Sequence, residues 1–337
     1  MAYTERRTST LRAALAALPL LLAGGLTAHA ADIDTSKRIK VAMVPKLVGL
    51  SVFKANQQGA ETAAKALNID FLYTGPVTAS AQGQVDVFNS LIARRFNAIT
   101  TTSNNPTQLA PALRRARKQG IKVVSYDSDV AADARDFFIQ NTDYADFGKA
   151  LVESVAKYAG PTAKVAILSS TPDATIQNEW INALKTYMTA TYPKMQIVTT
   201  QYGRSSPSQS LTAGLNILQA NPDVTGIIAP DGAAEVGAAA AVEKLGRTGK
   251  VFVTGCSDPD AIRQYVKAGI IKESPLWDEV KEGELVMYVA RLAVNNAIQR
   301  NGDFTAGDLG TFTAKDGVIV FSAPLIFNAA NIDQYKF

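Results

Sequence analysis

Histidine and cysteine are almost absent from the sequence, which has one residue of each type among its 337. His29 lies near the N-terminus, and Cys256 has no second cysteine with which to form an internal disulfide. A Ser-His-Asp or Cys-His nucleophilic system and a histidine-based metal site are therefore excluded from the rest of the chain. We expect no catalytic residue, no metal and no cofactor, although a hydrolase that works through carboxylates alone stays possible.

Blocks of like charge are also missing. The chain has 34 Lys and Arg residues against 30 Asp and Glu, so its formal net charge is only +4. Nucleic acids and anionic membranes attract proteins through concentrated basic surface. We expect neither of them as a partner.

The first 30 residues have the pattern of a secretory signal peptide. Basic residues at Arg6, Arg7 and Arg12 are followed by an apolar stretch and by the small-residue exit Ala28-His29-Ala30. The apolar stretch is too short and too often interrupted for a membrane-spanning helix. We predict that residues 1–30 are cleaved and that the mature protein is periplasmic.

The remaining chain is too long for one ordinary hydrophobic core and alternates between two kinds of segment. Short β-branched runs predict strands, and the stretches between them predict helices. Nearly continuous apolar strands separated by single helices are typical of parallel sheets covered on both faces. The expected strands fall into a first set at 38–44, 69–75, 97–103 and 121–128, and a second at 164–170, 196–203, 224–230, 250–257 and 270–277. We predict an α/β fold of two doubly wound parallel-sheet lobes with a ligand cleft between them.

Ligands of such sheets bind beyond the carboxyl ends of the strands, so the residues at these ends are the candidate site. Lys46 follows the first expected strand, with Phe53 shortly after it, and Asp127 follows the fourth. The second set contributes Gln177 after its first strand. The candidates at the later strand ends are Pro230, Asp231, Gly232, Ser257, Asp258 and Trp277.

This inventory of a cation, carboxylates, an amide and aromatic rings suits a small, neutral, polyhydroxylated ligand. Carboxylates and amides hydrogen-bond hydroxyl groups, and aromatic faces cover the C–H side of a sugar ring. Structural roles stay open for some candidates. Asp231 and Asp258 could equally be helix N-caps, and of Gln177 and Trp180 one could face the cleft while the other packs.

Nine motifs follow one another along the mature chain: VPKLVG, YTGP, YDSD, SSTPDATIQNEW, TTQYG, IIAPDG, GCSDPD, LWD and IFNAANIDQYKF. With them the chain resembles the type I periplasmic solute-binding proteins of ABC importers, in the branch of the Lsr-type autoinducer-2-binding and rhamnose-binding proteins. The resemblance implies two lobes joined by three crossings that close on the ligand like a hinge. It assigns residues 37–137 and 276–301 to the N-terminal lobe and 138–275 and 302–337 to the C-terminal lobe.

The resemblance also implies roles for individual residues. The positions that hold the hydroxyl-rich ligand of the autoinducer-2 receptors fall here on Lys46, Asp127, Gln177 and Pro230. Two positions depart from the pattern, since Ile176 stands in place of an Asp and Gly232 in place of an Ala. Losing a carboxylate removes charge-assisted hydrogen bonds, each worth roughly 1.5–3 kcal/mol. Ile176 instead suits a methyl or deoxy carbon, such as that of a 6-deoxy sugar.

The function expected from the resemblance is capture of a small sugar or deoxy sugar, rhamnose-like, and its delivery to an ABC permease in the inner membrane. Uptake of autoinducer-2 is the alternative, and a monomer is expected in either case. A ligand-sensing repressor core would have a helix-turn-helix segment where the signal-like segment stands. A carboxylate-pair glycosidase would need two carboxyl groups about 5–10 Å apart across the cleft, for which Asp127 and Asp258 are the candidates.

Overall fold

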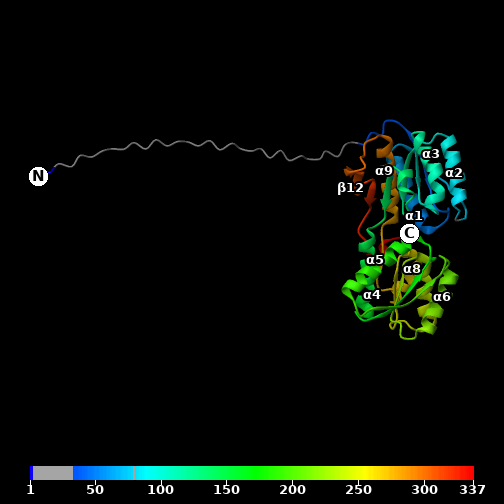
Figure 1. Cartoon of the computed structure of the whole chain (residues 1–337), viewed down its shortest axis with the longest axis vertical. Coiled ribbons are helices and arrows are strands. Elements are labelled where there is room, and N and C mark those ends of the chain that lie inside the picture. The colour runs from blue at the N-terminus through cyan, green and yellow to red at the C-terminus, as the bar shows by residue number, and fades with distance from the viewer. Residues whose placement is uncertain (3–32, 79) are drawn as a thin grey trace. The chain divides into compact units, whose positions relative to one another are not determined.

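The computed structural model describes residues 1–2, 33–78 and 80–337. The predicted signal peptide therefore lies outside the described residues, apart from its first two. From residue 33 onward, strands and helices alternate along the chain (Figure 1). Among the described residues, no helix combines the length and apolar character needed to cross a membrane.

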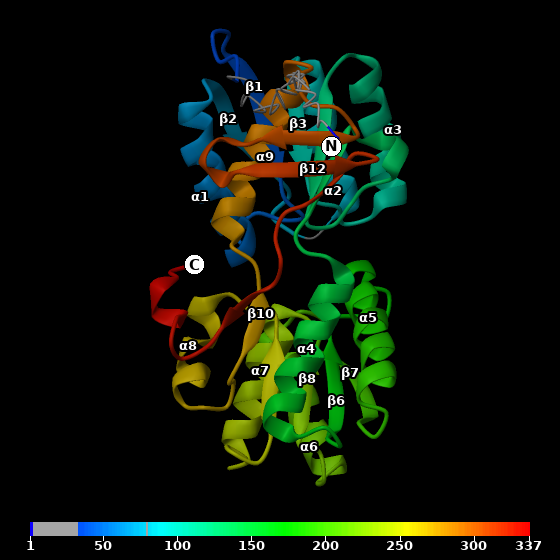
Figure 2. The same cartoon turned by 90° about the vertical axis from the view of Figure 1, so that its left-hand side faces the viewer.

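The first sheet has eight strands, in the order β11-β12-β13-β5-β4-β3-β1-β2. Strands β1 to β5 pair in parallel, β13 pairs in parallel with β5, and β11 to β13 pair with one another antiparallel. The strands are β1 Ile39–Val44, β2 Ile69–Tyr73, β3 Ala98–Thr101, β4 Lys122–Tyr126, β5 Phe137–Gln140, β11 Gly302–Thr305, β12 Thr311–Lys315 and β13 Val318–Val320. Its helices are α1 Ser51–Ala66, α2 Ala81–Ala93, α3 Pro106–Lys118 and α9 Glu279–Val294 (Figure 2).

The second sheet has four parallel strands in the order β7-β6-β8-β9. They are β6 Lys164–Ser169, β7 Gln196–Tyr202, β8 Gly226–Ala229 and β9 Phe252–Gly255. The accompanying helices are α4 Tyr144–Ala159, α5 Thr175–Thr191, α6 Pro207–Ala220, α7 Gly232–Lys244 and α8 Pro259–Lys267. A separate antiparallel pair joins β10 Ser274–Leu276 to β14 Leu325–Phe327.

The predicted fold class is confirmed. All four residues of β3 and all four of β8 are buried, because helices cover both faces of each sheet. This burial explains why β8 reads as a continuous apolar run rather than as an alternating one, whereas β3 ends in two buried threonines.

Strand pairing differs from the expected division of the chain in one place. Residues 302–320, which the resemblance assigns to the C-terminal lobe, form β11 to β13 and extend the first sheet beside β5. The strand expected at 270–277 is also shorter than predicted, because Ser274–Leu276 pair with β14 while Ile271 forms only an isolated parallel bridge with Val253 of β9. The lobe boundaries as a whole stay a prediction.

Helices α1 and α9 lie side by side against the first sheet (Figure 2). Their contact depends on two glycines, because a Cβ atom at Gly59 would lie 1.8 Å from the carbonyl oxygen of Val280, and one at Gly283 2.0 Å from that of Asn56. Only glycine allows backbones to approach so closely. This contact fixes the positions of the residues at the start of α9.

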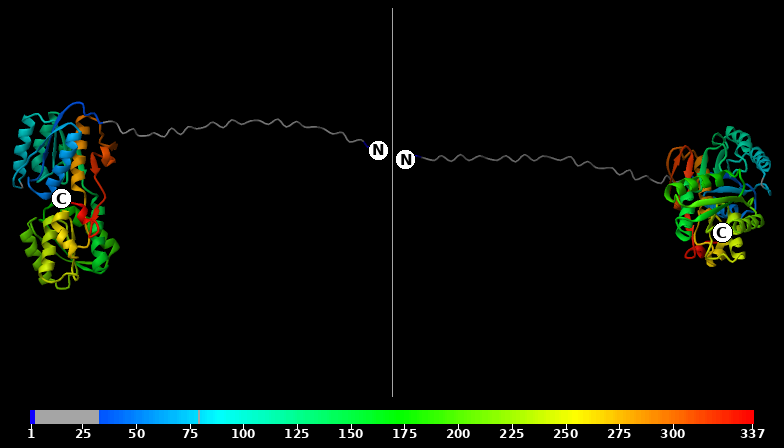
Figure 3. Two further views of the ribbon diagram at one scale, coloured as in Figure 1. Left: turned by 180° about the vertical axis from the view of Figure 1, so that it is seen from behind. Right: turned by 60° about the horizontal axis from the view of Figure 1, so that its bottom comes forward.

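The C-terminal segment packs against α8 (Figure 2), and the C-terminus lies against the folded part of the chain in both views of Figure 3. The carbonyl oxygen of Phe337 accepts a hydrogen bond from the backbone N–H of Asp260 at 3.1 Å. Arg263 donates to the carbonyl oxygen of Tyr335 at 2.6 Å. These contacts attach the end of the chain to the same part of the fold as the second sheet.

Candidate functional site

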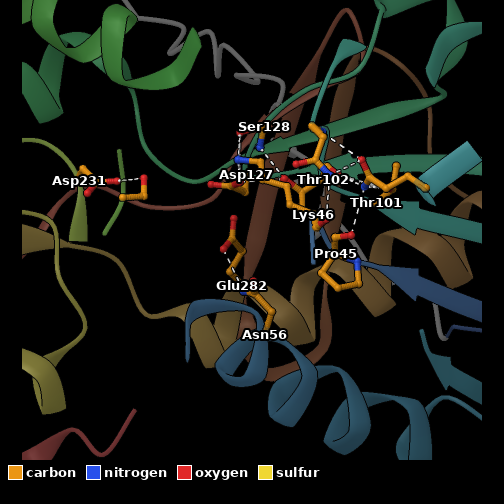
Figure 4. Close-up of polar contacts among 12 residues, drawn as sticks. Pro45, Lys46, Asn56, Thr101, Thr102, Asp127, Ser128, Asp231 and Glu282 are labelled. Atoms are coloured by element: carbon orange, nitrogen blue, oxygen red, sulfur yellow. Dashed lines mark hydrogen bonds and ion pairs between the residues drawn. The ribbon is translucent and has the colours of Figure 1, made fainter. Parts of the chain in front are cut away.

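Lys46 and Asp127 meet at the carboxyl end of the first sheet. Lys46 follows β1, Asp127 follows β4, and Lys46 Nζ lies 2.9 Å from Asp127 Oδ2. The same carboxylate oxygen accepts hydrogen bonds from Thr102 Oγ1 at 2.8 Å and from Ser128 Oγ at 3.1 Å (Figure 4). Lys46 also donates to Ser128 Oγ at 2.5 Å. The two residues are therefore held in one orientation by a polar network.

The backbone of Asp127 adopts a left-handed conformation, with φ at 55°. Among residues other than glycine, aspartate and asparagine adopt this conformation most readily. The turn directs the chain away from β4 while the carboxylate stays within the network.

A cavity of about 400 Å³ lies beside this network. Its lining includes Lys46, Ser128 and Asp129 from the segments after β1 and β4, together with Tyr144 at the start of α4 and Ile176 and Gln177 at the start of α5. Three residues predicted from sequence, Lys46, Ile176 and Gln177, therefore share one cavity. Tyr144 and Ser128 are lining residues that the sequence prediction missed.

The start of α5 forms an apolar wall. Ile176 is 6% exposed and belongs to an apolar cluster with Trp180 and Trp277. The ring of Phe147 lies 4.6 Å from that of Trp180 and 6.2 Å from that of Trp277, centre to centre. Trp180 thus packs in the core while Gln177 reaches the cavity, which decides between the two roles left open by the sequence.

Asp231 is a helix N-cap. Its Oδ1 accepts a hydrogen bond from the backbone N–H of Ala234 at 2.9 Å, and its Oδ2 accepts one from Ser205 Oγ at 2.7 Å. Burial raises the pKa of this carboxyl group. Both carboxylate oxygens thus have partners within the protein. The geometry shows Asp231 as the N-cap of α7.

Asp258 also precedes a helix, but its side chain makes no capping hydrogen bond to α8. It is 8% exposed, and burial raises its pKa. Its neighbour Ser257 is fixed by two hydrogen bonds, from its backbone N–H to Glu235 Oε2 at 2.7 Å and from its hydroxyl to the carbonyl oxygen of Gly232 at 2.5 Å. The carboxyl group of Asp258 hydrogen-bonds the side chains of Ser51 and Glu279 instead of capping α8.

Glu235 on α7 makes the stability of the fold pH-dependent. Complete burial raises its pKa from 4.5 to about 7, so ionising it in the folded protein costs roughly 3 kcal/mol. Between these two values the folded protein holds a proton that the unfolded chain has lost, so stability falls as the pH rises through this window. We expect Glu235→Gln to reduce the loss of thermal stability between pH 5 and pH 8 by several degrees.

The matched control is Glu243→Gln, which alters an exposed residue of the same helix. Thermal unfolding of both variants and the parent protein at the two pH values gives the comparison. Equal pH dependence in the Glu235→Gln variant and the parent would show that Glu235 is ionised in both states.

A second polar group at the site comes from α1 and α9, and the sequence prediction missed it. Asn56 Nδ2 donates to the carbonyl oxygen of Glu279 at 2.8 Å and to Glu282 Oε2 at 3.1 Å. Trp277, a predicted site residue, is 3% exposed and donates from Nε1 to the same Glu282 oxygen at 2.9 Å. The only sequence pattern that could have indicated this group is the pair of acids Glu279 and Glu282, three residues apart. Acids are common in the first turn of a helix, so the pair does not stand out.

Burial and the nearby Asp127 raise the pKa of Glu282 to about 8. The pKa of Glu279 is also raised, first by burial and then by Asp258, Glu282 and Asp127. These effects indicate that four carboxyl groups, from the end of β4, the start of α8 and the first turn of α9, lie close to one another. Figure 4 shows Glu282 extending from α9 toward Asp127.

The remaining predicted residues lie apart from this polar group. Phe53 is 3% exposed and packs in the core of the first sheet. Pro230 is buried directly after β8. A Cβ atom at Gly232 would meet nothing closer than 3.6 Å, so an alanine would fit there.

Comparison with known proteins agrees with this architecture. The family described as periplasmic binding protein domain matches residues 41–297. A sugar ABC transporter protein from Actinomyces odontolyticus ATCC 17982 has a TM-score of 0.80 and 33% sequence identity, covering 91% of this chain and 99% of that one.

Two further solved structures are similar and contain ligands. A solute-binding protein of an ABC transporter from Clostridium phytofermentas, with bound L-rhamnose, has a TM-score of 0.81 and 27% identity, covering 89% of this chain and 98% of that one. LsrB from Clostridium saccharobutylicum, in complex with AI-2, has the same TM-score and identity and covers 89% of this chain and 100% of that one.

The family match extends from within β1 to the residues just after α9, so it includes the second sheet, the parallel strands β1 to β5 of the first sheet and the polar groups described above. Members of this family bind solutes and do not transform them, which agrees with the nearly complete lack of histidine and cysteine. The chain belongs to the family of periplasmic binding proteins.

Proposed function

We propose that this protein is the sugar-binding component of an ABC transporter and that it captures a small sugar or deoxy sugar, rhamnose-like, for delivery to a permease. The observation that carries the proposal is the cavity that Lys46, Ile176 and Gln177 line together, beside the fixed Lys46–Asp127 pair. The similar proteins from A. odontolyticus and C. phytofermentas support the sugar class. Closure of two lobes about the ligand, periplasmic location and a monomeric state belong to the same proposal.

In this proposal Lys46, Asp127 and Gln177 hydrogen-bond the ligand's hydroxyl groups. Asp127 uses Oδ2 for three donors of the protein, and among the described residues its Oδ1 has no hydrogen-bond donor, so we assign this oxygen to the ligand. Hydrogen bonds to an ionised group are stronger than neutral ones, so this pair supplies much of the binding free energy.

Ile176 favours a ligand with an apolar carbon. Its side chain offers neither a donor nor an acceptor, and the aromatic cluster behind it holds it in place. A ligand hydroxyl directed at it would lose its hydrogen bonds to water without replacement. A methyl group, like C6 of L-rhamnose, would gain apolar contact.

Autoinducer-2 is the alternative ligand, because LsrB in complex with AI-2 is as similar to this chain as the protein with bound L-rhamnose. Lys46, Asp127 and Gln177 would serve either ligand. The discriminating residue is Ile176, which lacks the carboxylate that the resemblance leads us to expect there.

The test is thermal unfolding of residues 31–337 with a panel of L-rhamnose, L-mannose, D-allose, D-arabinose and AI-2. A ligand at 100 times its Kd should stabilise the protein by about 2.7 kcal/mol, which corresponds to several degrees in Tm. Stabilisation by a sugar and not by AI-2 supports the proposal. Stabilisation by AI-2 alone would replace it with the alternative, and no stabilisation by any of the five would refute the sugar class.

Replacing Ile176 by threonine is expected to change the preference between L-rhamnose and L-mannose, which differ by one hydroxyl group at C6. Threonine keeps the β-branched shape but adds a hydroxyl group, so contact with the methyl of L-rhamnose weakens and the hydroxyl of L-mannose gains a partner. A difference of one such group in an apolar pocket is worth roughly 1–3 kcal/mol. We expect the ratio of the two affinities to fall at least tenfold.

Isothermal titration calorimetry measures both affinities in the parent protein and the variant. Thr189→Ser, an exposed threonine at the far end of α5, is the control and should leave the ratio unchanged. A ratio that does not move in Ile176→Thr places the C6 group elsewhere in the cavity.

A further inference from the structure

Gln84 on α2 is a fully buried glutamine whose side-chain amide binds two loops at the candidate site. The residue is 0% exposed. Its Nε2 donates to the carbonyl oxygens of Pro45 at 3.1 Å and of Thr102 at 2.7 Å. Its Oε1 accepts hydrogen bonds from the backbone N–H of Asn104 at 3.1 Å and from Asn104 Nδ2 at 3.0 Å. Since an amide offers two N–H donors and two lone pairs, these bonds use it completely.

The carbonyl groups that Gln84 binds lie just past the ends of two paired strands. Pro45 follows β1, Thr102 follows β3, and these strands pair in parallel. Both residues are buried. Past the end of a strand the ladder no longer supplies partners, so a buried carbonyl group there needs a donor from elsewhere. Gln84 supplies one to each loop, and α2 thereby joins the loop after β1 to the loop after β3.

The two loops contribute directly to the cavity, since Lys46, Ser103 and Asn104 line it. Asn104 Nδ2, which Gln84 orients, also donates to the carbonyl oxygen of Lys46 at 2.7 Å. The backbone at Lys46 is therefore held twice, by Gln84 through Pro45 and by Asn104 through its own carbonyl group. Gln84 has no exposed surface, so it acts on a ligand only through these neighbours.

The position of Lys46 depends on this arrangement more than that of Asp127 does. Thr102, which Gln84 binds, donates from Oγ1 to Asp127 Oδ2 at 2.8 Å, but Ser128 donates to the same oxygen and would keep the carboxylate in place. Besides the hydrogen bonds to Gln84 and Asn104, the loop at 45–49 is fixed by one from the N–H of Val48 to the carbonyl oxygen of Pro76 at 2.9 Å. Loss of Gln84 therefore releases mainly the loop that carries Lys46.

We propose that Gln84 is a positioning residue for ligand binding, which joins the two loops and so holds Lys46 in the orientation that binds the ligand's hydroxyl groups together with Asp127. The inference rests on the proposed function and extends its site to a residue that does not touch the ligand. A lysine ammonium group is carried on a flexible four-carbon stem. Fixing the backbone from which this stem starts reduces the ordering that binding requires, and so strengthens binding.

Replacing Gln84 by methionine keeps the length of the side chain and removes the hydrogen bonds to both loops. We expect a 10- to 100-fold weaker affinity for L-rhamnose or D-allose, whichever binds the parent protein more tightly, in calorimetric titrations. Gln84→Glu is the second variant, because it keeps an acceptor for Asn104 but has no donor for the two carbonyl groups when it is ionised. It should also weaken binding.

Two controls lie on the same helix. Gln82→Met alters an exposed residue and should leave both the affinity and the Tm unchanged. Phe88→Leu alters a buried residue one turn beyond Gln84 that packs in an apolar cluster. It should lower the Tm of the free protein, because it removes apolar contacts, while the affinity for the sugar stays parental. Thermal unfolding without sugar checks that each variant folds.

A double variant separates positioning from a general loss of stability. If Gln84 acts through Lys46, adding Gln84→Met to Lys46→Met should weaken binding less than threefold further, because the group that Gln84 positions is already gone. If the two residues act independently, the effects multiply, and the second change again weakens binding 10- to 100-fold.

Parental affinity in both Gln84→Met and Gln84→Glu would overturn the inference and leave the proposed function standing. Independent effects of Gln84→Met and Lys46→Met would do the same, as would a loss of affinity in Phe88→Leu equal to that in Gln84→Met. If neither sugar binds the parent protein, the proposed function fails, and the positioning role fails with it.

Discussion

Replacing Asp127 by asparagine is expected to weaken sugar binding by about 10²–10³-fold. Removing one member of a hydrogen-bonded, largely buried charge pair costs roughly 2–5 kcal/mol in binding. Asp127 holds three donors on one oxygen, and its side chain is only 12% exposed, so water compensates little for the lost charge. The variant also leaves Lys46 beside a neutral amide.

Asparagine is the informative substitution because of the backbone. At φ 55° an alanine would add conformational strain, whereas asparagine adopts this conformation about as readily as aspartate. A loss of affinity in Asp127→Asn therefore reports the charge and not a shift of the loop after β4.

Calorimetric titration with the sugar that stabilises the parent protein most gives the affinity. Asp133→Asn removes an exposed carboxylate that pairs with Arg114 and should change nothing, because exposed ion pairs contribute little. Lys46→Met combined with Asp127→Asn should cost less than the sum of the two single changes, because each single change leaves a charge without its partner. An Asp127→Asn variant with parental affinity would remove Asp127 from the site.

The two parallel sheets and part of the site follow from local sequence patterns. Buried strands such as Gly226–Ala229 need apolar residues on both faces, so they stand out against the helices between them. The position of Lys46 and Asp127 follows from the rule that ligands bind beyond the carboxyl ends of strands. Their proximity could be predicted without any tertiary information.

Sheet membership of residues 302–320 could not be predicted in the same way. Strands β11 to β13 form antiparallel pairs that are local in sequence, but the pairing of β13 with β5 joins segments about 180 residues apart. Nothing in an apolar run specifies which sheet edge it joins. That choice depends on where α9 ends in space, because the chain continues from there into β11.

The site at α1 and α9 was missed for a related reason. Glu279 and Glu282 have the pattern of exposed first-turn acids, and Asn56 lies within an otherwise ordinary amphipathic helix. They become buried only because Gly59 and Gly283 let the two helices approach. Phe53 lies on the side of α1 that faces the core, and its ligand contact stays a prediction.

The same helix contact leads to the largest effect that we expect on stability. In Gly283→Ala, the added Cβ atom would lie 2.0 Å from the carbonyl oxygen of Asn56, so α1 and α9 must move apart. Overpacking of this kind costs roughly 1–3 kcal/mol, and more where backbone atoms are in the way. We expect Tm to fall by about 5 °C or more, at roughly 2–4 °C per kcal/mol.

Gly232→Ala is the control, because it is also a Gly→Ala change in a helix and its Cβ atom has no neighbour closer than 3.6 Å. Alanine is the better helix former, so this variant should be as stable as the parent protein or slightly more stable. Thermal unfolding without sugar compares the three proteins. Equal Tm values for Gly283→Ala and the parent would mean that the two helices separate without cost.

The sugar-dependent part of the same measurement relates the helix contact to the site. Separating the helices displaces Asn56, whose amide donates both to Glu279 and to Glu282. If the helix contact also fixes the residues that hold the ligand, Gly283→Ala lowers the stabilisation produced by the sugar as well as the Tm of the free protein. If only the free protein loses stability, the glycines serve helix packing alone, and the ligand is held by the network around Lys46 and Asp127.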